Sequence, residues 1–227
     1  MVVGCGLIAT AFLTDFFLDY IIFATGIANS KINDLTEANK EKTLLHKYCS
    51  DNKNKTIIYF STYSVNDSDL NTNLYVTHKL EMEEIVKNSG LKYYVIRTNN
   101  LVGNNLYDKS TIMNYLYHHI ANNLEFTLWK NAYRNFLDVE HLLLMVKQLI
   151  KQQCTSGVYY LINPLSHSLL VVVSEFEKII KVKANPDIVN LGNRFECDTS
   201  LSITLFNDIG LSTDNYLHLL LKKYYCH

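Results

Sequence analysis

The feature that most constrains the fold is the alternation of short apolar runs with longer amphipathic segments. The apolar runs, which are rich in β-branched and aromatic residues typical of buried strands, occupy residues 1–4, 20–25, 56–61 and 93–97. The segments between them, which have helical periodicity, occupy residues 7–17, 34–51 and 75–88. Strands that alternate with helices form parallel sheets, so we expect an α/β fold with a doubly wound, Rossmann-like parallel sheet.

The pattern becomes less regular after Gly103. We expect helices at 110–122, 139–152 and 169–180 and strands at 126–129 and 157–162. On this basis the dinucleotide-binding domain comprises residues 1–104 and 139–163. A small C-terminal substrate-binding lobe comprises residues 105–138 and 164–227. Earlier in the chain, Asp34 and Glu37 have the spacing of a capping box and should begin the helix at residue 34.

The bulk composition excludes several classes of protein. With 227 residues, 48% of them hydrophobic, the chain can bury one substantial core. Its net charge of -1 provides no field that would attract nucleic acid or an anionic membrane. The five cysteines are scattered without a CxxC pair, which favours reduced thiols. We therefore expect a soluble, cytoplasmic protein without a membrane span, a nucleic-acid partner or a metal site.

A glycine-containing turn follows the first expected strand. Gly4, Gly6 and Ala9 have the spacing G-x-G-x-x-A between a strand and a helix. Glycines there allow the backbone to approach a pyrophosphate closely, and the helix start supplies amide donors. When this spacing is considered alone, an ordinary turn without a ligand explains it about as well as a nucleotide-binding turn does.

Two residues at the start of a later helix have a spacing suited to proton transfer. Tyr75 and Lys79 are four residues apart and should share a helical face. A nearby ammonium group favours the phenolate, which a tyrosine with an ordinary pKa of about 10 needs near neutral pH. The strand before this helix ends in Ser61, Thr62 and Ser64, whose hydroxyls could hold a substrate oxygen or bond their own backbone.

Five motifs in order resemble the extended short-chain dehydrogenases/reductases, the NAD-dependent epimerase/dehydratase group that acts on sugar nucleotides. The matching stretches are the glycine turn, YIIFATG, FSTYSV followed by YVTHK, YYVIRTNNLVGNN and AYRNFLDVEHL. The resemblance implies catalytic roles for Thr62, Tyr75 and Lys79. It implies a cofactor, NAD or NADP, held by Gly4, Gly6, Leu7, Ile8, Ala9, Ala24, Tyr75 and Lys79. It also implies a nucleotide-sugar substrate held by Thr62, Asn100 and Arg134, the latter two at its diphosphate.

The chain departs from the family pattern at the adenosine side of the cofactor. The family has a second strand and helix before the stretch that corresponds to YIIFAT, and this chain has almost nothing there. Asp15 or Asp19 could replace the missing ribose contact, although solvated residues at a helix end explain them more simply. We therefore expect a loosely held adenosine and weak discrimination between NAD and NADP.

The resemblance favours an oxidoreductase in nucleotide-sugar metabolism, as in polysaccharide biosynthesis. We expect a reductase of a nucleotide-linked keto sugar, with an epimerase second. A 4,6-dehydratase is disfavoured because Tyr63 and Ser64 stand where an acidic residue should follow Thr62. A catalytically silent nucleotide-binding or scaffold protein is the alternative of another class, and a homodimer remains open.

Three other candidates have simpler explanations. His118 and His119 lack a carboxylate or cysteine at ligand spacing, so an ordinary surface pair is favoured over a metal site. Cys5 has no partner base and is interpreted as a packing residue. Trp129 and residues 126–128 should line the small lobe, or stack on a substrate base.

Overall fold

The computed structural model describes residues 1–26, 35–66, 73–105, 108–194 and 196–226. These residues form two compact units. Unit 1 contains Met1–Thr98 and Val146–Leu161, and unit 2 contains Asn99–Met145 and Ile162–His227. The long α5 (Val139–Lys151) begins in unit 2 and ends in unit 1.

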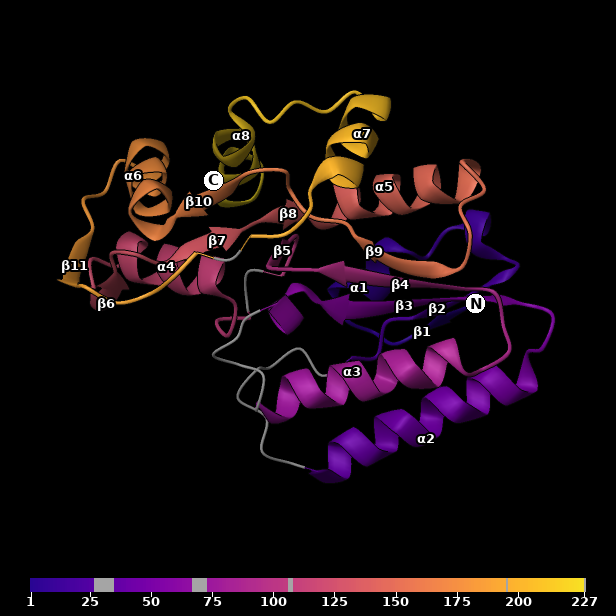
Figure 1. Cartoon of the computed structure of the whole chain (residues 1–227). Helices are drawn as coiled ribbons and strands as arrows, with labels where there is room; N and C mark the ends of the chain where they lie inside the picture. Colours follow the sequence, from indigo (N-terminus) through magenta and orange to yellow (C-terminus); the bar gives the residue numbers. More distant parts are fainter. Residues whose placement is uncertain (27–34, 67–72, 106–107, 195, 227) are drawn as a thin grey trace. The chain divides into compact units, whose positions relative to one another are not determined.

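Unit 1 is built on a five-stranded parallel sheet (Figure 1). Its strands, in spatial order, are β1 (Val2–Val3), β2 (Tyr20–Phe23), β3 (Thr56–Thr62), β4 (Tyr93–Thr98) and β9 (Gly157–Tyr160). Every neighbouring pair is parallel, which confirms the α/β, Rossmann-like fold expected from the sequence. Among the described residues the sheet ends at β1, as expected from the missing second strand.

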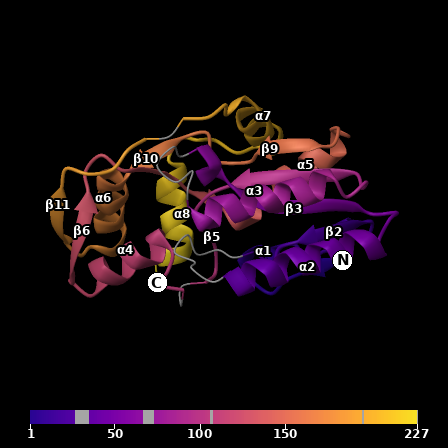
Figure 2. The same ribbon diagram turned by 60° about the horizontal axis from the view of Figure 1, so that its bottom comes forward.

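Two helices cover one face of this sheet. Figures 1 and 2 show α2 (Leu35–Asp51) and α3 (Leu74–Lys87) side by side along the strands. Asn73 caps α3 by accepting a hydrogen bond from the Tyr75 amide at 2.8 Å, which places Tyr75 in the first turn. The capping residue Asp34 expected for the preceding helix lies outside the described residues.

The first helix is shorter than the sequence predicted. In place of one helix over 7–17, α1 covers Leu7–Ala11 and a separate 3-10 turn covers Asp15–Phe17. The break brings Phe12 and Phe17, which are both buried, to a ring-centroid distance of 5.2 Å. Packing of two aromatic side chains has therefore outweighed continuation of the helix.

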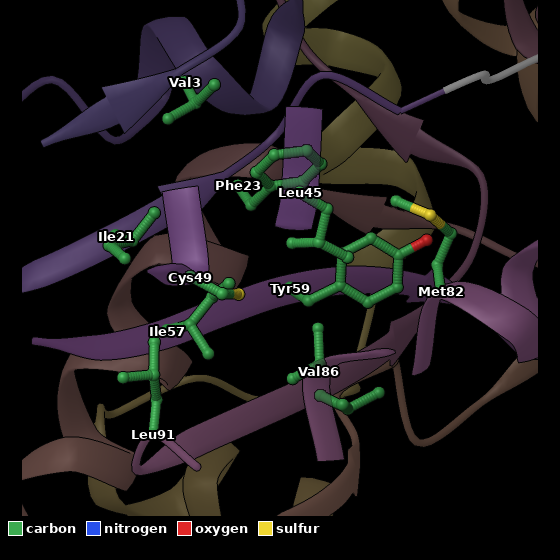
Figure 3. Close-up of a cluster of buried hydrophobic side chains, with 11 residues drawn as sticks. Val3, Ile21, Phe23, Leu45, Cys49, Ile57, Tyr59, Met82, Val86 and Leu91 are labelled. Atoms are coloured by element: carbon green, nitrogen blue, oxygen red, sulfur yellow. The ribbon is translucent and has the colours of Figure 1, made fainter. Parts of the chain in front are cut away.

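The core of unit 1 lies between the sheet and these two helices (Figure 3). It contains Val3, Ile21, Phe23, Leu45, Cys49, Ile57, Tyr59, Met82, Val86, Leu91 and Val95. Figure 3 shows the labelled side chains pointing toward one another from the strands and from both helices. Burying each large apolar side chain contributes about 1.5–3 kcal/mol, so this cluster fixes α2 and α3 against the strands.

Unit 2 has three short strand pairs and several helices. The pairs are β5 (Leu101–Val102) with β8 (Leu137–Asp138), β7 (Tyr133–Asn135) with β10 (Ser166–Ser168), and β6 (Glu125–Trp129) with β11 (Asn185–Val189). The helices that lie wholly in unit 2 are α4 (Ile112–Ala121), α6 (Leu169–Ile180), α7 (Ser200–Asp208) and α8 (Tyr216–Tyr225). Phe126 and Leu128 of β6 are buried, whereas Trp129 is exposed.

Across the described ranges, no helix has the length and apolar character of a membrane span. The same residues contain no group of three or more histidine, cysteine or acidic side chains arranged to hold a metal ion.

Candidate active site

Three of the expected site residues of unit 1 lie at the carboxyl ends of its parallel strands. Gly4 comes directly after β1, Ala24 directly after β2, and Thr62 is the last residue of β3. Parallel α/β sheets bind their ligands at this edge, because strand ends and helix starts leave backbone groups exposed there. The topology therefore brings the expected cofactor and catalytic positions of unit 1 to one edge of the sheet.

The two glycines of the first turn have different structural roles. Gly4 has φ +127, and a Cβ there would lie 2.5 Å from the carbonyl oxygen of Ala24. Glycine is thus required at position 4 for the close approach of the β1 and β2 ends. A Cβ at Gly6, by contrast, would have no heavy atom of the described residues within 4 Å apart from its neighbours in the chain. The backbone at Gly6 is open to a ligand, as the sequence spacing predicts for a pyrophosphate.

The residues after Gly6 begin α1. Leu7 and Ile8 are half-buried, and Ala9 is buried. The amides at the start of a helix have no partner inside the helix and point outward, so those of Leu7 and Ile8 are available to an anion. The small side chain of Ala9 lets this first turn pack closely on the core.

Thr62, Tyr75 and Lys79 are brought together at the end of β3. The Thr62 side chain interacts with Tyr75 and lowers the pKa of its phenol, and the Thr62 Oγ1 accepts a hydrogen bond from the Ser64 amide at 3.1 Å. The Lys79 Nζ lies 5.9 Å from the centre of the Tyr75 ring, one helical turn further on. The Lys79 ammonium also donates to the carbonyl oxygen of Phe60 at 3.4 Å. A hydroxyl, a phenol and a cation therefore adjoin one another in unit 1.

Burial changes the acid–base properties of this trio. The pKa of Tyr75 is raised, chiefly because the ring is buried; the interaction with Thr62 opposes this and the charge of Glu41 adds to it. The pKa of Lys79 is lowered, again chiefly by burial, while Glu41 and Glu83 act in the opposite direction. From the sequence, only the effect of the cation on Tyr75 was expected. The structure adds desolvation, which favours a neutral phenol.

The neighbouring hydroxyl of Ser61 has a different partner. It donates a 2.6 Å hydrogen bond to Glu83, which is buried on α3. Arg97 of β4 binds both oxygens of the same carboxylate, at 2.9 and 2.8 Å, and donates to the Tyr160 hydroxyl at 2.7 Å. This network joins α3 to β3, β4 and β9. It fixes the helix that contains Tyr75 and Lys79.

The two expected diphosphate contacts belong to unit 2. Asn100 has a positive φ of 31, and its side-chain amide donates to the Asn135 carbonyl at 2.9 Å. The Arg134 Nη1 donates to the Tyr133 carbonyl at 2.7 Å. Arg134 is paired with His167 across β7 and β10, so the two side chains emerge on the same face of that pair. The guanidinium of Arg134 and the imidazole of His167 therefore lie on the same face of the β7–β10 pair.

Three polar residues near these positions were not predicted from the sequence. Glu41 and His78 are buried beside Lys79, and His167 lies opposite Arg134. One signal for Glu41 was present in the sequence: it occupies the buried helical stripe of α2, with Ala38, Leu45 and Cys49. A carboxylate within an apolar stripe indicates a buried partner. No comparable sequence signal marks His167.

The fold is similar to solved structures of nucleotide-sugar enzymes. The UDP-glucuronic acid 4-epimerase from Bacillus cereus, in complex with UDP-glucuronic acid and NAD, matches with a TM-score of 0.73 at 18% identity, over 95% of this chain and 78% of that one. The UDP-glucose 4-epimerase from Thermus thermophilus, in complex with NAD, matches with a TM-score of 0.66 at 12% identity, over 90% and 76%. RMD from Pseudomonas aeruginosa, complexed with NADPH, matches with a TM-score of 0.63 at 17% identity, over 90% and 79%.

The resemblance in sequence motifs therefore extends to the three-dimensional fold. At these identities the likeness establishes the fold alone. No family model matches the sequence, and no curated protein matches it either.

Proposed function

We propose that this protein is an NAD(P)-dependent enzyme that reduces a nucleotide-linked keto sugar, with Tyr75 as its general acid. The observation that carries the proposal is the placement of Tyr75 at the carboxyl end of β3, where the Thr62 hydroxyl interacts with it and the Lys79 Nζ lies 5.9 Å from the centre of its ring. A keto oxygen placed at this hydroxyl pair receives a proton from Tyr75 while Thr62 holds it within about 3 Å.

The residues of unit 1 fit a nicotinamide dinucleotide in its nicotinamide and pyrophosphate parts. The open backbone at Gly6, with the amides of Leu7 and Ile8, suits the pyrophosphate. Ala24 lies beside this turn, and Tyr75 and Lys79 suit the nicotinamide ribose. When bound in its reduced form, the cofactor supplies the hydride for the sugar carbon. The solved structures with NAD and NADPH on the same fold support this assignment.

The protonated state of Tyr75 fits the acid role in reduction. Reduction of a ketone requires a proton donor, whereas oxidation of an alcohol requires a base. A phenol with an ordinary pKa of about 10 carries its proton at neutral pH, and burial raises the pKa of Tyr75 further. Tyr75 is thus prepared for the acid role, and Lys79 stabilises the phenolate that remains after the proton has been transferred.

The truncated edge of the sheet supports the same conclusion. A reductase must release the oxidised cofactor and bind a reduced one in every cycle, while an epimerase regenerates its cofactor and gains from retaining it. Among the described residues no strand lies beyond β1 to provide an adenosine pocket. Loose binding of the adenosine suits an enzyme that exchanges its cofactor.

A nucleotide-sugar 4-epimerase is the second candidate. It is favoured by the similarity of the fold to solved UDP-sugar 4-epimerases. For either reaction we propose that Asn100 and Arg134 of unit 2 contact the diphosphate of the substrate, with His167 next to Arg134. Arg134→Ala should then raise KM more than it lowers kcat, whereas Lys130→Ala, an exposed cation in the same segment, should not.

Turnover of purified protein distinguishes these functions. The protein is incubated with NADPH or NADH and a panel of nucleotide-linked 4-keto sugars, and the absorbance of the reduced nicotinamide is followed. A reductase consumes one cofactor for each sugar reduced. An epimerase interconverts the corresponding UDP-hexoses without net consumption. Absence of both reactions, together with absence of cofactor binding, would contradict the proposal and leave a silent scaffold.

A further inference from the structure

Two buried residues with no role in the reaction proposed above lie next to Lys79. Glu41 on α2 is 5% exposed, and His78 on α3 is 2% exposed. The His78 Nε2 and the Glu41 Oε2 are 2.9 Å apart. Both residues belong to unit 1. A carboxylate and an imidazole are costly to bury unless they are paired, so this contact is a specific feature of the α2–α3 packing.

The hydrogen-bond partners of the His78 ring indicate which of its nitrogens carries the proton. The His78 Nδ1 is buried and has no hydrogen-bond partner among the described residues. An imidazolium would carry N–H groups on both ring nitrogens and leave one of them buried without an acceptor. The neutral ring with its proton on Nε2 avoids this cost and donates to Glu41. The hydrogen bond with His78 holds the Glu41 carboxylate in a fixed orientation.

Glu41 also faces Lys79. A Cβ at Gly26 would lie 2.7 Å from the Lys79 Nζ and 3.8 Å from the Glu41 Oε1, so these two atoms approach the same point of the backbone. The other carboxylate that acts on Lys79 is Glu83. Arg97 already binds Glu83 through two hydrogen bonds and balances its charge. Of the two carboxylates, Glu41 has the larger effect on the pKa of Lys79, which it raises.

We propose that Glu41, oriented by His78, is the buried counter-charge that keeps Lys79 an ammonium ion beside Tyr75. The catalytic importance of this charge rests on the proposed function, since the Lys79 ammonium beside Tyr75 stabilises the phenolate left by proton transfer. Glu41 is a positioning residue that acts through Lys79. Within the described part of the chain, the ionisable groups facing Lys79 are Glu41 from α2, Tyr75 and Glu83 from α3, and Tyr59 from β3.

The test follows Lys79 directly. In protein labelled with ¹³C at lysine Cε, the Lys79 resonance is assigned by its loss in Lys79→Met and is titrated with pH. Glu41→Gln removes an opposite charge from the buried site of Lys79 and should lower the pKa of Lys79 further, by about 1–3. Glu37→Gln is the matched control. It removes an exposed carboxylate one turn earlier on α2 and should leave the titration unchanged.

Variants of His78 test the orienting hydrogen bond. His78→Gln retains an N–H at the position of Nε2, so Lys79 should titrate in this variant as it does in the wild type. His78→Leu removes the donor, makes the Glu41 anion less stable, and should lower the pKa of Lys79 in the same direction as Glu41→Gln. Circular dichroism establishes folding for each variant. If Glu41→Gln does not fold, His78→Leu and Glu41→Asp replace it, and Glu41→Asp should retain most of the effect of the charge.

An unchanged Lys79 titration in folded Glu41→Gln or His78→Leu would overturn this proposal. The titration needs neither cofactor nor substrate, so its result is separate from the success or failure of the proposed function. In active enzyme, Glu41→Gln should also move the alkaline limb of kcat to lower pH by a similar amount. A general loss of packing would instead lower kcat equally at every pH, and that result would contradict the role of the charge.

Discussion

The end of β3 and the edge at β1 belong to one sheet but are built very differently. At the end of β3, buried Thr62 and Lys79 surround Tyr75, and Glu83 fixes the helix behind them. At the other edge, β1 is two residues long. Beside it, Leu13 is 70% exposed and Leu18 is 66% exposed. Under the proposed function, the end of β3 holds the reacting half of the dinucleotide, and the β1 edge offers less surface to hold its adenosine.

The largest effect should follow from removing one hydroxyl at the β3 end. Tyr75→Phe deletes the proposed proton donor and should lower kcat by about 10²- to 10⁴-fold. The protein should remain folded, since losing the interactions of one hydroxyl costs about 1 kcal/mol. Tyr93→Phe, at the amino end of β4, is the matched control and should retain activity. Equal rates in Tyr75→Phe and the wild type would remove the β3 end from the mechanism.

The buried carboxylate behind the site provides the next test. Glu83→Ala leaves the Arg97 guanidinium largely buried without its partner and should destabilise the fold by about 3 kcal/mol in urea unfolding. Glu84→Ala removes the neighbouring, exposed carboxylate, which pairs with Lys87 at 2.7 Å. That exposed pair should contribute less than about 1 kcal/mol. Similar losses of unfolding free energy in both variants would show that the stability of α3 does not depend on the Glu83 network.

The two glycines at the β1 edge should respond in opposite ways. Gly4→Ala forces a side chain onto a positive φ and into the Ala24 carbonyl, and should cost about 1–3 kcal/mol of stability. Gly6→Ala meets no neighbour and should leave stability within about 0.5 kcal/mol. It should instead weaken cofactor binding by about tenfold, equivalent to ~1.4 kcal/mol. Unchanged cofactor affinity in Gly6→Ala would place the pyrophosphate elsewhere.

The smallest expected difference is that between NAD and NADP. Since no strand of the described ranges lies beyond β1 to carry a ribose-binding carboxylate or a phosphate-binding arginine, the two affinities should agree within about tenfold, or ~1.4 kcal/mol. Titration of the protein with each cofactor, followed by fluorescence, measures this. A preference of about a hundredfold would mean that other residues rebuild the adenosine pocket.

The sequence predicted the β3 end well because its signals are local. The β-branched and aromatic run of β3 indicated a buried strand, and the four-residue spacing of Tyr75 and Lys79 placed both on one helical face. The contact of Glu41 with His78 joins residues separated by 37 positions, and only the packing of α2 on α3 brings them together. Local periodicity contains no information about that pairing.

Unit 2 was predicted less completely for a related reason. Its helices α4 and α6 have strong apolar stripes and were expected, but β5 and β8 contain two residues each. A two-residue strand has no period to detect, and its existence depends on a partner far along the chain. The β7 and β10 strands, which bring His167 to Arg134, contain three residues each and depend in the same way on a partner far along the chain.

Calorimetric titration with the two halves of the cofactor compares the two ends of the sheet in a single experiment. Reduced nicotinamide mononucleotide contains the nicotinamide, its ribose and one phosphate, and AMP contains the adenosine and the other phosphate. If affinity resides at the β3 end, the mononucleotide should bind within about tenfold of NADH, and AMP should bind at least about tenfold more weakly than the mononucleotide. AMP binding as tightly as NADH, with no binding of the mononucleotide, would show that affinity resides at the β1 edge instead.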